Sequence, residues 1–299
     1  MCCAKETRLH QAHSLAESGP ASTPAGPQAE LVFAPAPDGR TYISHQRVGY
    51  PFHITRPFYL DPDPAGLLTL YLQSVSGGIY RGEHLALSLE AEAGSQAQVT
   101  TQSATIVHRM QGGGEARQDM IIRVDAGALL EYLPDPLILF PGARFHTSLR
   151  VVAAPTATVI LCDAFTQHDS EASGGRFERL VSDTRIERPD GALLAFDRFD
   201  ISGALGEAHF DGAGGDYPAH GTVIAVHDGC PAEELAGVLS EALGECSGIY
   251  AGASTMPHDC GAWARILAED GHSLRAALKA AWAAARRKVS GADPARRPK

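Results

Sequence analysis

Short stretches of alternating apolar and polar residues dominate the first two thirds of the chain. Between residues 67 and 75, three leucines occupy every second position, with Thr69, Tyr71 and Gln73 between them or beside them. This period of two is typical of β-strands, and segments rich in Pro and Gly separate the stretches as turns. The pattern predicts strands over residues 31–33, 40–48, 52–60 and 67–75.

A loose internal repeat follows these strands. An Ala-Gly turn leads into an apolar stretch at residues 93–97 and again at 126–130, with weaker copies at 154–158 and 189–193. The copies recur irregularly, about 30 residues apart, so they do not define a regular solenoid. They indicate a mainly β fold in which stacked strands form an irregular superhelix or sandwich.

The last quarter of the chain changes to helical patterns. A helix is predicted over residues 231–243, a strand over 247–253, a short helix over 262–267 and a longer helix over 273–288. We expect a single β-rich domain over residues 29–288, which includes these helical elements after residue 231. Low hydrophobic content predicts disordered tails at residues 1–28 and 289–299.

Composition and charge argue against several classes of function. The 299 residues carry a net charge of −10, which argues against nucleic-acid binding because a phosphate backbone requires a basic surface. No apolar run is long enough for a transmembrane helix, and the N-terminus lacks the apolar segment of a signal peptide. The six cysteines form no CxxC pair, and we interpret them as reduced thiols. A cytoplasmic protein is therefore expected.

Standard catalytic motifs are missing from the sequence. Residues 252–256 lack the second glycine of G-x-S-x-G, and residues 112–115 lack the lysine of a phosphate-binding loop. We therefore expect neither a serine hydrolase nor a nucleotide site.

Two short clusters combine histidine with cysteine and aspartate. One holds His227 and Cys230, and the other holds His258 and Cys260. Imidazole and thiolate suit nickel, copper or zinc. Each cluster offers at most three ligands on a loop, however, so ordinary surface histidines are the alternative interpretation.

The central run, residues 77–140, places polar groups inside apolar strands. Such groups are costly to bury unless they are hydrogen-bonded or hydrated. They are either turn and edge residues or the wall of a water-filled interior passage that would hold a divalent cation weakly. The candidates for this wall are Glu83, Thr101, Thr105, Glu131 and Asp135.

Three phrases in this run resemble a known family. They are GGIYRGE at residues 77–83, TTQSATIVHR at 100–109 and EYLPDPLILFPGA at 131–143. In this order and spacing they are similar to the motifs of the urease accessory protein D family, called H in some bacteria. The likeness covers roughly residues 40–288.

The resemblance implies a non-enzymatic scaffold with no tightly bound cofactor. Members of that family bind urease apoprotein together with accessory proteins F and G, of which G is a GTPase. Together they deliver nickel, bound only transiently, to the urease active site. The family fold is a β-superhelix with a few helices, and an internal tunnel has been proposed as the nickel path.

Three positions depart from the family motifs. Glu83 replaces the usual aspartate, Ile106 the usual lysine and His108 the usual tyrosine. Glu83 keeps the carboxylate on a longer side chain, whereas His108 adds a possible metal ligand.

Two other functions stay open at this point. The first is a β-helical hydrolase or lyase that uses Glu131 and Asp135 as acid and base. An aromatic content of only 7% argues against it, because β-helical polysaccharide enzymes usually carry grooves rich in aromatic residues. The second is a plain interaction module that carries no ion.

Overall fold

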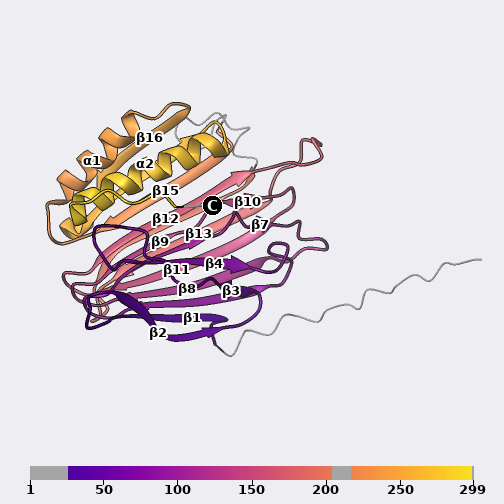
Figure 1. Ribbon diagram of the computed structural model, residues 1–299. Coiled ribbons are helices and arrows are strands. Elements are labelled where there is room, and N and C mark those ends of the chain that lie inside the picture. Colours follow the sequence, from indigo (N-terminus) through magenta and orange to yellow (C-terminus); the bar gives the residue numbers. More distant parts are fainter. Residues whose placement is uncertain (1–25, 204–216, 298–299) are drawn as a thin grey trace, which may run out of the picture.

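Two β-sheets packed face to face form the body of the protein (Figure 1). The computed structural model describes residues 26–203 and 217–297, so most of the expected N-terminal tail lies outside the described residues. The first sheet has seven strands, in the order β14 (Leu193–Ile201), β13 (Arg179–Glu187), β11 (Arg144–Ala153), β8 (Ala116–Val124), β5 (His84–Ala91), β1 (Ala29–Pro35) and β2 (Thr41–Val48).

The second sheet lies opposite and is larger. Its main path runs through β16 (Ile249–Thr255), β17 (Gly261–Ala268), β15 (Ala219–Val226), β12 (Thr158–Gln167), β9 (Leu129–Leu133), β6 (Gln96–Thr101), β4 (Leu68–Ser74) and β3 (Phe52–Ile54). Two short strands pair with each other beside the end of β12: β7 (Ile106–Val107) and β10 (Leu137–Leu139).

The chain winds between the two sheets as a stack of coils. It passes from β5 to β6, from β8 to β9 and from β11 to β12, and neighbouring coils pair in parallel within each sheet. The Ala-Gly turns at residues 93–97 and 126–130 and the weaker copy at 154–158 make these crossings. The turns bond to one another, since Leu129 N–H donates to the carbonyl of Ser95 at 2.9 Å and Thr158 N–H to that of Ala128 at 2.8 Å. The predicted β-superhelix is confirmed.

The fourth copy of the repeat has a different role. Residues 189–193 join β13 and β14, which pair antiparallel within the first sheet. At this turn the chain therefore stays within the first sheet, and it returns to the second sheet only with β15.

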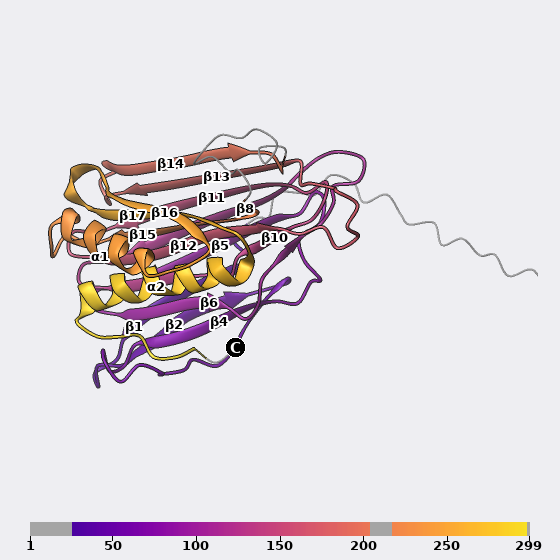
Figure 2. The ribbon, with the colours of Figure 1, turned by 90° about the horizontal axis from the view of Figure 1, so that it is seen from above.

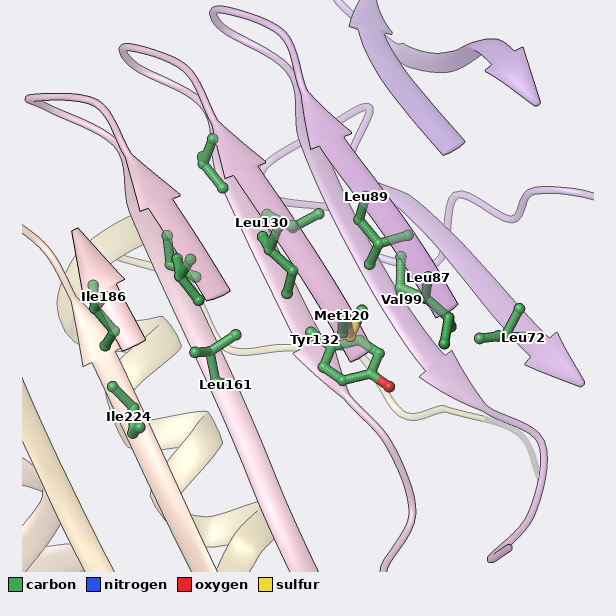
Figure 3. Close-up of a cluster of buried hydrophobic side chains, with 14 of the residues drawn as sticks. Leu72, Leu87, Leu89, Val99, Met120, Leu130, Tyr132, Leu161, Ile186 and Ile224 are labelled. Atoms are coloured by element: carbon green, nitrogen blue, oxygen red, sulfur yellow. The ribbon is translucent and has the colours of Figure 1, made fainter. Parts of the chain in front are cut away.

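An aliphatic core fills the space between the sheets. Leu87, Leu89 and Met120 project from the first sheet toward Val99 and Leu130 of the second (Figure 3). β4 is buried on both faces, because Thr69 and Tyr71 are covered as well as the leucines. The alternating pattern of β4 therefore identifies the strand but not a solvent-facing side.

Two helices cover the outer face of the second sheet (Figure 2). They are α1 (Ala232–Gly244) and α2 (Gly271–Ser290), close to the predicted helices. Asp270 caps α2 by accepting the N–H of Ser273 at 2.7 Å, and Gly291 ends the helix in the left-handed conformation.

The predicted short helix over residues 262–267 is wrong. This segment is strand β17, in which Ala262, Ala264 and Ile266 are buried under the helices while Trp263 and Arg265 face the other way. The alternation has a period of two, and the alanines in it suit the close approach of the helices rather than a helical segment.

The end of the chain also differs from the expected tail. Helix α2 continues to Ser290, and the following residues lie against the second sheet up to Arg297. No helix in the described residues is long and apolar enough to cross a membrane.

Candidate functional site

A cavity of about 320 Å³ lies between the two sheets, at the end opposite the Ala-Gly turns. Three of the predicted wall residues line it: Thr101, Thr105 and Asp135. The hydroxyl oxygen of Thr101 accepts the N–H of Asp135 at 2.8 Å, so the phrases at residues 100–109 and 131–143 meet here. Exposed Gly77 and Gln102 also line the cavity, which therefore reaches the surface at this end.

Asp163 on β12 lies at the deep end of this cavity. Its Oδ2 accepts the hydroxyl hydrogen of Ser182 on β13 at 2.7 Å, a bond that joins the two sheets. The side chain of Asp163 is half-buried and lines the cavity space. Burial raises the pKa of Asp163, while Ser182 and Arg265 act in the opposite direction. Burial also raises the pKa of the neighbouring Tyr132, another residue of the lining.

A second cavity of about 550 Å³ continues from Asp163 toward β14 and β16. Its walls include the ring of His220, which stacks on Phe165 with centroids 4.7 Å apart. Burial lowers the pKa of His220, so the imidazole is held neutral. The guanidinium of Arg265 also lines this cavity, where it donates to the hydroxyl of Thr222 at 3.0 Å and pairs with Asp197.

Asp163 is the residue that both cavities share, among those that the structure describes. Oxygen groups thus extend from the mouth at Gln102, past Thr101 and Asp135, to one deep carboxylate. Hydroxyl, carbonyl and single carboxylate ligands bind a divalent cation loosely compared with a set of imidazoles or thiolates. The arrangement therefore suits transient contact with a cation.

Asp163→Asn is expected to change the pH dependence of stability. Because the pKa of Asp163 is raised on folding, wild-type stability falls as pH rises from the ordinary carboxyl value near 4 through the folded-state pKa. Asparagine carries no such cost, so the stability of the variant relative to wild type should increase across this window and then level off. Urea unfolding at a series of pH values measures it. A difference that is constant with pH would contradict the assignment.

His108 lies beside the cavity mouth and not inside it. Its ring stacks on Tyr80 at 4.4 Å, and its Nε2 is 3.0 Å from the carbonyl oxygen of Gly77. A side chain on Gly78 would come within 2.7 Å of this Nε2, which explains why glycine with a φ of +135° occupies this position. His108 therefore holds the glycine turn at the mouth.

Glu83 lines neither cavity. Its carboxylate accepts the N–H of Tyr80 at 2.9 Å and closes the turn before β5. The structure thus separates Glu83 from Thr101, Thr105 and Asp135, with which the sequence grouped it.

Glu131 lies on the opposite face of the second sheet, under α2. Its side chain is fully buried, and both of its oxygens accept hydrogen bonds from the guanidinium of Arg286. Gln98 donates to the same carboxylate at 2.8 Å. Arg286 also lies 3.4 Å from Asp61, which pairs with Arg297 at 2.7 Å. Glu131 therefore belongs to a buried ionic cluster and not to the cavity wall.

The two His/Cys loops approach each other at the turn end of the sheets without forming a metal site. His227 Nδ1 is 2.9 Å from the hydroxyl of Thr158, and Cys260 is a buried core residue whose pKa is raised by burial. His258 adopts a φ of +61°, and Cys230 packs beside α1. In the described part of the chain, no group of three or more His, Cys, Asp or Glu side chains could hold a metal ion.

Sequence reasoning missed Asp163, Ser182 and His220. Asp163 does leave a signal, because it interrupts the apolar run of β12 with a charge. Its partner Ser182 lies in the other sheet, and only the winding of the chain brings the two together.

The fold and the cavities define a class of protein: a β-superhelical protein whose apolar core contains two partly polar cavities. Comparison with known proteins is specific. The family model for the UreD urease accessory protein matches residues 25–299. The chain is 42% identical over 266 residues to urease accessory protein UreD 1 of Pseudomonas syringae pv. syringae, which covers 89% of this chain and 93% of that protein.

Relatives from other bacteria also match over most of the chain. UreD 1 of Methylorubrum extorquens is 41% identical over 94% of this chain and 96% of its own length. UreD 2 of Streptomyces griseus is 36% identical over 88% of this chain and 89% of its own length. The chain belongs to the UreD family of urease accessory proteins, and its role lies in urease maturation.

Proposed function

We propose that this protein is a non-enzymatic scaffold that delivers nickel to urease. In this proposal it binds urease apoprotein and the accessory proteins F and G, and nickel is a transient cargo and not a resident cofactor. The ion passes between the two sheets, along the cavity that contains Thr101, Thr105 and Asp135, and reaches the second cavity at Asp163. The observation that carries the proposal is that one deep carboxylate is shared by both cavities.

The charge distribution supports a passage better than a storage site. A cation that enters at Gln102 meets hydroxyl and carboxylate oxygens, and then Asp163, whose charge is costly to bury alone. A divalent cation would offset that cost, which favours occupancy. One carboxylate is too few ligands for tight capture, so release stays possible.

The two carboxylates that the hydrolase or lyase alternative needs as acid and base lie on different sides of the second sheet. Glu131 is bound by Arg286 on the outer side of the second sheet, whereas Asp135 lines the inner cavity. The two carboxylates therefore do not face a common substrate.

Deletion of the gene in its host tests the proposal. Urease activity in nickel-containing medium is expected to be lost and to return when the gene is restored. Normal urease activity in the deletion strain would contradict the proposal. Equilibrium dialysis of the purified chain with nickel, alone and in complex with its partners, then distinguishes a nickel carrier from a module that only joins proteins.

A further inference from the structure

Four strands stand at the ends of the two sheets: β2 and β14 in the first, β3 and β16 in the second. The edge of a sheet exposes unpaired backbone groups that can pair with another chain, and proteins usually block such edges with charges, bulges or short strands. The four strands differ in how they are protected.

Three of the four end strands carry such a device. β3 has only three residues. β2 carries His45 and Arg47, and its register with β1 shifts at a bulge. β14 carries Arg198 and Asp200, and its register with β13 shifts as well.

β16 carries none of these devices. Its seven residues, Ile249–Thr255, include no charge and no proline, and its register with β17 is regular throughout. Within residues 26–203 and 217–297, β17 is its only strand partner. An unprotected edge of this length is a template for an added strand.

The hydrogen-bond ladder shows which backbone groups are available. Met256 N–H donates to the carbonyl of Gly261, and Glu269 N–H donates to that of Gly248, so the even-numbered residues of β16 bond to β17. In an antiparallel pair the alternate residues point their N–H and C=O groups away from the partner. Ala251, Ala253 and Thr255 therefore present their backbone groups outward.

The side chains of β16 point alternately to two opposite faces of the strand. Ile249, Ala251 and Ala253 pack against the core under α1. Tyr250 and Gly252 face the other way and line the second cavity, and Tyr250 is 60% exposed. A strand added to β16 would direct alternate side chains toward this cavity.

The second cavity suits an aromatic or bulky apolar side chain. Phe165, Phe199 and Tyr250 contribute rings to its wall, and the guanidinium of Arg265 lies 5.5 Å from the Phe199 ring centroid. Its volume of about 550 Å³ exceeds that of any single side chain, and a cation beside aromatic rings favours a further ring.

We propose that β16 is the docking edge for an extended segment of a partner protein, which adds a strand to the second sheet and inserts an aromatic or bulky apolar side chain into the second cavity. The inference rests on the proposed function, because it assigns that segment to one of the urease maturation partners. The backbone pairing supplies affinity, and the cavity selects the side chain.

Gly252→Lys tests the proposal by placing a charge on the cavity-facing side of β16, where the added strand would insert its side chain. A side chain at Gly252 meets no atom within 4 Å, so the fold should tolerate the change. Gln46→Lys on the exposed edge strand β2 is the matched control. Binding of the full chain to urease apoprotein with accessory proteins F and G is expected to weaken at least tenfold for Gly252→Lys and to stay unchanged for Gln46→Lys.

Amide hydrogen exchange of the wild-type chain tests the same proposal without a substitution, and it can be used if Gly252→Lys folds poorly. On complex formation, the amides of Ala251, Ala253 and Thr255 should exchange at least tenfold more slowly. Unchanged exchange in a complex that forms would overturn the docking edge alone. Slow exchange of these amides in the free chain would overturn it as well. Protection independent of concentration would mean that residues of the same chain cover β16, and protection that rises with concentration would mean that a second copy does. Failure of wild type to bind any of these proteins would overturn the proposed function too.

Discussion

Glu131→Ala is expected to lower the free energy of unfolding by about 3–5 kcal/mol, the usual cost of removing one partner from a buried ion pair. The change leaves the guanidinium of Arg286 buried, with Asp61 as its remaining charged partner at 3.4 Å. Gln98 loses its acceptor at the same time. Urea unfolding of the purified full chain measures the effect.

Two further variants separate charge from packing. Glu131→Leu combined with Arg286→Met removes the pair together and should recover a substantial part of the lost stability, because no uncompensated charge remains. Glu83→Ala, which alters an exposed turn, should cost less than 1 kcal/mol. If Glu131→Ala unfolds like wild type and yet abolishes urease activation, Glu131 would act in the ion path after all.

Asp163→Ala is expected to reduce urease activation at least tenfold in the deletion host. The reason is that Asp163 is the carboxylate at which the two cavities meet, so its loss removes the deep ligand of the proposed passage. Asp163→Asn should reduce activation similarly, although the amide can still accept the bond from Ser182. Urease activity per unit of urease protein is the measurement.

The matched control for this prediction is Asp119→Asn. Asp119 lies on the outer face of the first sheet, where its carboxylate is 2.5 Å from His84 Nε2 and 42% exposed. The same chemical change there should leave activation within twofold of wild type. Equal losses for both aspartates would mean that general acidity matters and not the passage.

The sequence indicated the winding of the chain well, for a physical reason. The turns of the repeat recur where each coil crosses between sheets. The strands that follow them are apolar because the second sheet is covered on both faces, by the first sheet and by the helices. Helix α2 could also be predicted from the sequence, because Leu274, Leu278 and Trp282 lie on one face. Strand β17 was misassigned because its alanines fit either element.

The sequence predicts only part of the site. Thr101 ends β6, Thr105 lies just beyond it, and Asp135 lies just beyond β9. Their proximity follows from the stacking of coils. Glu131 belongs to the same motif, but it lies on the helix-covered face of its strand, where Arg286 binds it from 155 residues away. Such distant pairing leaves no local pattern in the sequence.

The nickel content of urease is the measurement that tests the proposed passage most directly. Urease purified from the deletion host should contain its full complement of nickel when wild type is restored, and less than a tenth when Asp163→Ala is supplied. The variant must be shown to fold and to bind urease apoprotein with its partners as wild type does. Full nickel content with Asp163→Ala would contradict a path through the space between the sheets.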